Sequence, residues 1–179
     1  MQLDSFKNSD FDRGAPILKE ILWLIICWLL LSSWLPGSGW RTFLLRLFGA
    51  RIGQGVIFKP RVRVKFPWRL TIGNHCWIGE NVWIDNLTDV TLGDHVCVSQ
   101  GAYFCTGSHD WGIQSFDLII KPIRVYSFAW IAAKSVVGPG VEIGEGAVLG
   151  LGGIATRTLN PWTIYTWNPL VSIKARPRS

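Results

Sequence analysis

A six-residue period in hydrophobicity constrains the fold of this 179-residue chain more than any other feature. From Ile72 an aliphatic residue returns at every sixth position, with a two-residue slip before Leu92, and the period resumes at Val125. Ten segments share it: IGNHCW, IGENVW, IDNLTD, LGDHVC, VSQGAY, VYSFAW, IAAKSV, VGPGVE, IGEGAV and LGLGGI. Neither an α-helix nor an ordinary alternating β-strand has this period.

The period predicts a triangular β-solenoid in which three short strands form each coil. The first residue of every hexapeptide is Ile, Leu or Val and would fill the prism, while the fifth is small or β-branched and would fit near a corner. Gly and Asn supply the positive φ that tight corners require. Neighbouring coils complete one another's hydrogen bonds by stacking in parallel. A weaker match at residues 52–57 is expected to form the first coil.

The repeat loses phase between Phe104 and Val125, which are 21 residues apart, because 21 is not a multiple of six. We therefore expect residues 105–122 to leave the solenoid as a loop. This loop contains His109, Asp110 and Trp111, and loops on rigid scaffolds often carry the chemistry of a protein.

His109 is the candidate general base, since an imidazole with a pKa of about 6.5 can take a proton from a hydroxyl at neutral pH and return it to a leaving group. Asp110 or a backbone carbonyl could orient its ring. His75 and His95 each take the fourth position of a hexapeptide. That position points outward at a turn and favours a solvated or packing role.

The apolar segment Ile21–Leu35 precedes the repeats, and Pro36 ends it. As a helix it would be about 22 Å long at 1.5 Å per residue, short of the hydrocarbon core of about 30 Å. Acidic residues before it and the lack of a small-residue cleavage site argue against a signal peptide. The segment predicts a helix apolar on all sides that either packs on its own domain or a neighbouring subunit, or lies in a membrane interface.

The basic charge is concentrated early in the chain. Residues 1–70 contain 11 basic and 4 acidic residues, whereas residues 71–179 contain 7 and 8. A basic segment is compatible with nucleic acid, anionic lipid or an acidic substrate, and composition does not choose among them. The 4 Cys have no metal-binding spacing and are expected to be reduced thiols in a cytosolic protein.

The hexapeptides resemble the hexapeptide-repeat acyltransferase family, whose fold is a left-handed parallel β-helix, usually assembled as a homotrimer. Three segments narrow the resemblance: Trp83-Ile84-Asp85-Asn86-Leu87, Cys105-Thr106-Gly107-Ser108-His109-Asp110, and RTFLLRLFGAR from Arg41. They are similar to the colanic acid biosynthesis acetyltransferases, relatives of the maltose and galactoside O-acetyltransferases.

The resemblance implies an acetyl-CoA-dependent O-acetyltransferase that acts on a sugar or lipid-linked glycan hydroxyl in exopolysaccharide synthesis, with no metal and no nucleic acid partner. It assigns catalysis to His109 and Asp110, and substrate binding to Asp85, Asn86 and Trp111. The coenzyme A groove, which the family places between two subunits, would involve Ala133, Leu151, Thr156, Arg157 and Lys174. The departures from the family pattern are Leu151 and Trp167.

Two alternatives remain open at this point: a γ-carbonic-anhydrase-like metal enzyme that uses three His, and a non-catalytic assembly subunit of a polysaccharide synthesis complex. The expected organisation is an all-β solenoid over residues 50–175 with the loop at 105–122. An apolar helix and basic segment (1–49) precede it and a tail (176–179) follows. We expect the protein in the cytoplasm, either free or bound to the inner face of the membrane through residues 17–69.

Overall fold

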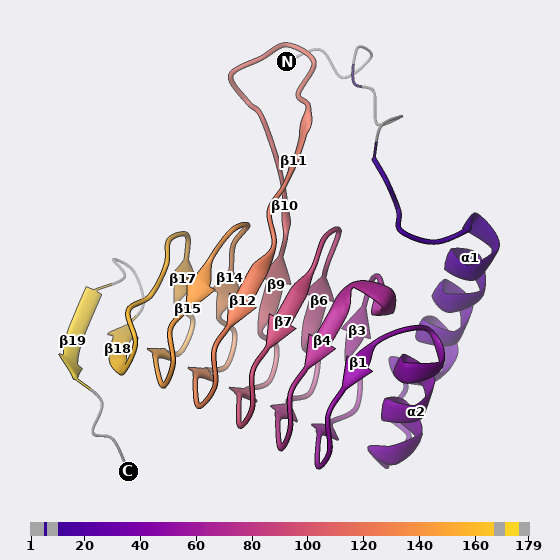
Figure 1. The fold of residues 1–179 in the computed structure, drawn as a ribbon, viewed down its shortest axis with the longest axis horizontal. Coiled ribbons are helices and arrows are strands. Elements are labelled where there is room, and N and C mark those ends of the chain that lie inside the picture. Colours follow the sequence, from indigo (N-terminus) through magenta and orange to yellow (C-terminus); the bar gives the residue numbers. More distant parts are fainter. Residues whose placement is uncertain (1–5, 7–10, 167–170, 176–179) are drawn as a thin grey trace.

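The computed structural model describes residue 6, residues 11–166 and, for the backbone alone, residues 171–175. Three sheets form the faces of a prism (Figure 1). The first face contains β1 (Arg51–Ile52), β4 (Leu70–Ile72), β7 (Val90–Leu92), β12 (Ile123–Val125) and β15 (Glu142–Ile143). The second contains β2 (Ile57–Phe58), β5 (Trp77–Ile78), β8 (Cys97–Val98), β13 (Trp130–Ile131), β16 (Val148–Leu149), β18 (Thr163–Thr166) and β19 (Val171–Ala175). The third contains β3 (Arg63–Val64), β6 (Trp83–Asp85), β9 (Tyr103–Cys105), β14 (Val136–Val137) and β17 (Ile154–Ala155).

The hexapeptide aliphatics fill the prism as the period predicts. All ten first-position side chains are at most 2% exposed. Strand register stacks each on its equivalent in the next coil, as Ile72 on Leu92 and Val125 on Ile143. Pairing within the prism is parallel, and only the final pair, β18 with β19, is antiparallel within these faces. The predicted parallel β-helix is confirmed.

Aromatic rings stack along the corner between the first and second faces. The ring centroids of His75 and His95 are 5.3 Å apart, those of His95 and Phe128 5.3 Å, and those of Phe128 and Trp162 6.4 Å. All four residues have positive φ, between 54° and 64°. This ladder gives His75 and His95 a packing role at equivalent turns of successive coils.

Helical segments cover the N-terminal end of the prism: α1 (Ile17–Ile26), the π-helical turn η2 (Cys27–Leu31) and α2 (Gly39–Leu47) (Figure 1). The indole of Trp23 is fully buried and donates from Nε1 to the carbonyl of Val64 at 2.9 Å. Its ring centroid lies 5.1 Å from that of Phe48. The helices thereby cover the end of the first coil, which would otherwise expose its core to water.

The predicted helix over Ile21–Leu35 is wrong in its bounds, since the helical residues begin at Ile17 and end at Leu31. The helix also takes in Lys19 and Glu20, which precede the predicted segment, and the buried Glu20 pairs with Arg13 at 2.6 Å. The helix ends early because the fully buried Arg41 fixes the following turn. Its guanidinium donates to the carbonyls of Leu31, Ser33, Leu35 and Gly37. Such charge-assisted bonds to backbone are strong.

Among the residues described, none of the helices combines the length and the hydropathy needed to cross a bilayer. The boundaries proposed for the N-terminal segment, the solenoid and the tail stay predictions.

Candidate active site

A hairpin projects from the corner between the third and first faces, after β9 of the third coil (Figure 1). Its strands are β10 (Gly107–His109) and β11 (Leu118–Ile120), which pair antiparallel with His109 opposite Leu118. Thr106 fixes its base, because its fully buried hydroxyl donates to the Asp85 carbonyl at 3.1 Å and its own carbonyl accepts the Lys121 N–H at 2.9 Å. The residues that break the six-residue period therefore form a hairpin that is anchored at its base.

The imidazole of His109 is held by Phe116 from across the hairpin. His109 Nδ1 lies 2.8 Å from the Phe116 carbonyl oxygen, and the two rings stack at 4.2 Å with planes 2° apart. A carbonyl oxygen can only accept, so Nδ1 carries the proton of the neutral ring and Nε2 carries the lone pair. Phe6 adds an edge-on contact at 5.5 Å. This tautomer leaves Nε2 as the basic nitrogen.

Asp110 and Trp111 lie in the hairpin turn. The Asp110 carboxylate accepts the N–H of Gly112 at 2.9 Å, and the Asp110 N–H donates to the Asp117 carbonyl at 2.9 Å. These bonds stabilise the turn, while the ring of His109 is oriented by a backbone carbonyl, which is the second of the two options that the sequence left open. Trp111 is 88% exposed.

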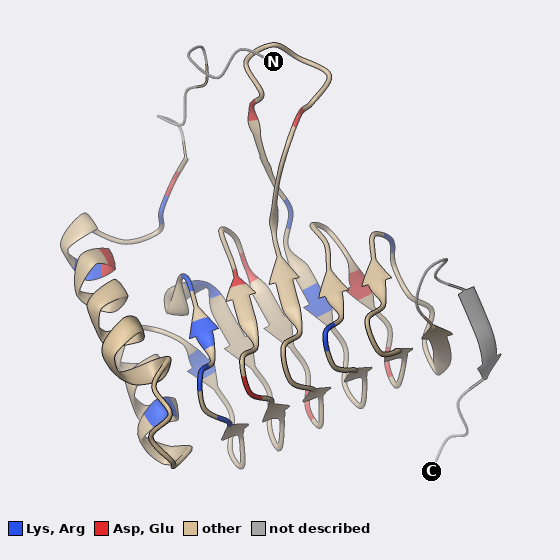
Figure 2. Ribbon diagram, turned by 180° about the vertical axis from the view of Figure 1, so that it is seen from behind, with Lys and Arg blue, Asp and Glu red and all other residues tan. Residues whose placement is uncertain are grey.

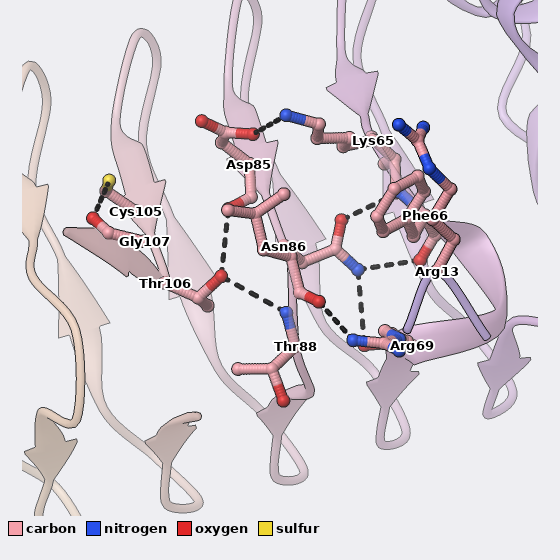
Figure 3. Close-up of polar contacts among 12 residues, drawn as sticks. Arg13, Lys65, Phe66, Arg69, Asp85, Asn86, Thr88, Cys105, Thr106 and Gly107 are labelled. Atoms are coloured by element: carbon pink, nitrogen blue, oxygen red, sulfur yellow. Dashed lines mark hydrogen bonds and ion pairs between the residues drawn. The ribbon is translucent and has the colours of Figure 1, made fainter. Parts of the chain in front are cut away.

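Asp85 faces outward from the end of β6, beside the strand that runs into the hairpin (Figure 3). Lys65 Nζ lies 3.2 Å from Oδ1, and the Tyr103 hydroxyl donates to Oδ2 at 3.1 Å. The side chain of Asp85 is only 17% exposed. Burial of the Tyr103 phenol raises its pKa, and the neighbouring thiol of Cys105 and the Asp85 carboxylate act in the same direction. Tyr103 therefore stays a neutral donor to Asp85.

Asn86 points the other way and is fully buried (Figure 3). Its Oδ1 accepts the Phe66 N–H at 3.0 Å, and its Nδ2 donates to the carbonyls of Phe66 at 2.7 Å and Arg69 at 3.2 Å. These bonds fix the short helix η3 (Pro67–Arg69) of the preceding coil. The substrate-binding role predicted for Asn86 is corrected here, because its amide is occupied by backbone groups inside the protein.

The predicted coenzyme A residues lie along two edges of the third face. Ala133 and Leu151 sit where the second face turns into the third, and the Ala133 carbonyl accepts the Gly152 N–H at 2.9 Å. Thr156 and Arg157 follow β17 at the corner that also carries the hairpin, two coils further on, and both are exposed. Lys174 lies in β19, opposite Ile164, but its side chain lies outside the described residues, as does all of Trp167.

Three contact residues were missed from the sequence: Phe116, Lys65 and Tyr103. Lys65, Asp85 and Cys105 are spaced by 20 residues, which is one coil at this edge. That spacing could have identified Lys65 as a neighbour of Asp85. In the described part of the chain, no group of three or more His, Cys, Asp and Glu side chains is arranged to hold a metal ion.

The sequence relatives decide the family. The chain is 39% identical over 166 residues to a protein of Escherichia coli K12 named colanic acid biosynthesis acetyltransferase WcaF, an alignment that spans 92% of this chain and 91% of the relative. The chain belongs to this acetyltransferase family. Within a wider group, the galactoside O-acetyltransferase of E. coli K12 is 26% identical over 68% of this chain and 61% of its own length. No protein-family model matches the chain.

Solved structures show the same fold. A hexapeptide-repeat acetyltransferase from Vibrio cholerae, solved with acetyl coenzyme A, superposes with a TM-score of 0.83 at 23% identity and covers 98% of this chain and 97% of its own. A galactoside acetyltransferase in complex with coenzyme A gives a TM-score of 0.80 at 23% identity, with 94% and 86% covered. At this identity the likeness establishes the solenoid architecture shared with the acetyltransferase family.

Proposed function

We propose that this acetyltransferase transfers the acetyl group of acetyl-CoA to a sugar hydroxyl during the synthesis of an exopolysaccharide similar to colanic acid, with His109 as general base. The observation that carries the proposal is the bond between His109 Nδ1 and the Phe116 carbonyl, at 2.8 Å. It selects the tautomer whose Nε2 can accept a proton. Family membership supports the acetyl transfer, and the bound ligands named for the two solved structures support acetyl-CoA as donor.

In this mechanism Nε2 of His109 removes the proton of the acceptor hydroxyl as its oxygen attacks the thioester carbonyl. The tetrahedral oxyanion would be stabilised by a nearby donor such as a backbone N–H. As the C–S bond breaks, the thiolate of coenzyme A takes the proton from the imidazolium. Phe116 holds the ring throughout, since Nδ1 keeps its proton in both charge states and donates it to the Phe116 carbonyl oxygen.

We assign Asp85 to the acceptor, as the carboxylate that holds a second hydroxyl of a free sugar or of a lipid-linked glycan. Lys65 and Tyr103 each contact a different oxygen of Asp85, which fixes the rotamer of the carboxylate. Trp111, at the exposed tip of the hairpin, offers an apolar surface to the same ligand. Asp110 contributes through the turn that it stabilises.

We assign the coenzyme A groove to Ala133, Leu151, Thr156, Arg157 and Lys174. The first four of these occupy two edges of the third face, and we therefore place the groove between two neighbouring chains of a homotrimer. We propose that this homotrimer works in the cytoplasm. Exposed backbone groups would bind the pantetheine arm, and Arg157 or Lys174 the phosphates.

The decisive experiment compares His109→Ala with the matched control His95→Ala in a coenzyme A release assay over free sugars, sugar nucleotides and lipid-linked glycans. Loss of the base should lower the rate by about a hundred- to ten-thousand-fold, whereas the control removes only a ring of the corner ladder. Both variants should keep the mass of a trimer, about 60 kDa for three chains of 20.1 kDa. Full activity of His109→Ala would refute the base assignment. Failure of the unmodified protein to bind coenzyme A would favour a non-catalytic assembly subunit.

A further inference from the structure

The outer surface of the α1–η2 segment is apolar. Its inner stripe, which includes Trp23, Cys27 and Leu31, is buried on the solenoid. The side chains that point away from this stripe are 49–77% exposed at Ile17, Leu18, Ile21, Leu22, Leu24, Ile25, Trp28 and Leu29, and Trp34 and Leu35 continue the surface at 63% and 56%. An ordinary surface helix presents polar residues there. An exposed apolar patch of this kind marks a protein or membrane contact.

A cationic pocket adjoins the apolar surface. It has a volume of about 340 Å³ and is lined by Trp28, Ser32, Arg61, Arg63 and Asn81. The Arg61 guanidinium lies 5.0 Å from the ring centroid of Trp34, and that of Arg63 lies 4.4 Å from the ring of Trp83. Both cations are therefore held against indole faces at the border between apolar and polar surface.

No carboxylate neutralises these two cations in the part of the chain that the structure describes. The ion pairs there join Arg13 to Glu20, Lys65 to Asp85, Arg69 to Asp12 and Arg124 to Glu142. The sequence has no Asp or Glu between Glu20 and Glu80. In Figure 2 the coils next to the helices carry mainly blue segments, whereas red and blue segments both appear on the later coils. A pocket with two such guanidinium groups is complementary to an anion.

We propose that this end of the molecule docks on an anionic phospholipid bilayer, with the α1–η2 surface in the interface and a lipid phosphate in the pocket of Arg61 and Arg63. Guanidinium groups bind phosphate oxygens in pairs of hydrogen bonds. Trp28 and Trp34 have the amphipathic rings that concentrate at headgroup level. The apolar surface and the phosphate pocket share Trp28, so one orientation on the bilayer satisfies both.

The bilayer explains the charge better than a second copy of this chain does. A copy related by a two-fold axis would cover the patch with apolar side chains but would leave the cations of the first coil facing one another. An anionic leaflet supplies acyl chains for the helix and phosphates for the cations at adjacent depths. Figure 1 places the helices at one end of the prism and the hairpin on its flank, so docking leaves the candidate active site uncovered.

The test is cosedimentation of the full chain with phosphatidylcholine vesicles, with and without phosphatidylglycerol. The double variant Arg61→Gln/Arg63→Gln should bind the anionic vesicles about thirty-fold more weakly. The control Arg124→Gln, far along the first face, should bind as the unmodified protein does. Trp28→Ser/Trp34→Ser should lose binding to both vesicle types, while Trp111→Ser, which removes an equally large exposed indole elsewhere, should not.

Circular dichroism and mass measurements of each variant check that the fold and the oligomeric state are unchanged. Both should be, because all the substituted side chains are at the surface. Equal binding of the double Arg variant and the unmodified protein would overturn the proposal. Binding of inorganic pyrophosphate without any vesicle binding would assign the pocket to a soluble anion and would also overturn it. A fall in the oligomeric mass of Trp28→Ser/Trp34→Ser would overturn it too, by showing that the surface is a subunit contact.

Discussion

At the scale of single residues, Asp85 and Asn86 show how one position along the chain separates two roles. Asp85 ends a strand with its carboxylate outward, against Lys65 and Tyr103, whereas Asn86 turns into the corner and bonds three backbone groups of the previous coil. Successive side chains of a strand point to opposite sides. The Asp85 carboxylate is therefore placed where a substrate could contact it, whereas the Asn86 amide is not.

This difference predicts opposite effects of two substitutions. Asn86→Ala should lower the free energy of unfolding by about 3 kcal/mol, because it leaves buried backbone donors and acceptors without partners. Asp85→Asn should change stability by less than about 1 kcal/mol but should reduce acetyl transfer by weakening acceptor binding. Denaturant titration and the coenzyme A release assay measure the two quantities. A stable Asn86→Ala protein would contradict the structural role.

At the scale of elements, the corner ladder explains why a solenoid with so few residues per strand keeps its register. Each coil places a residue of positive φ at the corner between the first and second faces, and the rings of His75, His95, Phe128 and Trp162 stack along it. Gly146 continues this series, with φ of 63°, and a Cβ added to it would lie 2.5 Å from the Trp162 ring. The glycine allows Trp162 to lie flat over the preceding coil.

Gly146→Ala should therefore cost about 2–3 kcal/mol of stability, from the left-handed backbone and from displacement of Trp162. Gly152→Ala is the matched control. Its φ is 66°, but a Cβ added there would meet nothing within 4 Å, so the cost should be about 1 kcal/mol from the backbone alone. Thermal unfolding of the two variants separates the cost of the left-handed backbone from the cost of displacing Trp162. Equal losses would mean that Trp162 moves freely.

At the scale of the whole molecule, burial of titratable side chains predicts how stability depends on pH. Burial raises the pKa of the Cys27, Cys76 and Cys97 thiols above the value of 9.0 for an exposed thiol, and burial raises the pKa of Tyr103 in the same way. Above that pH the unfolded chain loses protons that the folded chain keeps. The free energy of unfolding must then fall as the pH rises.

We expect stability to be constant from neutral pH to about pH 8 and to fall as the pH passes 9, the pKa of the thiols in the unfolded chain. Urea unfolding under reducing conditions, repeated across this range, measures the decline. Cys97→Ser removes one of the titrating thiols and should make the decline shallower. A curve that stays flat beyond pH 10 would contradict the burial of the thiols.

The whole molecule also shows which parts of the candidate site were accessible to prediction. The loss of the six-residue phase between Phe104 and Val125 predicted where the hairpin leaves the solenoid, and His109 was the general base expected within it. The partner of His109 was not predictable as one residue, since the backbone carbonyl of Phe116 carries no signal of residue type. Asn86 was misjudged because its position next to Asp85 does not reveal which of the two turns inward at a corner.

The sequence by itself determined the parallel solenoid, its core and the point at which the chain leaves it, because a six-residue period is a local property repeated in each hexapeptide. Only the tertiary structure decided the tautomer of His109, the cluster around Asp85 and the pocket of Arg61 and Arg63 beside Trp28. It also set the end of the N-terminal helix, through Arg41. These features depend on contacts between coils or across a turn, and such contacts exist only once the chain has stacked and fixed the direction of each side chain.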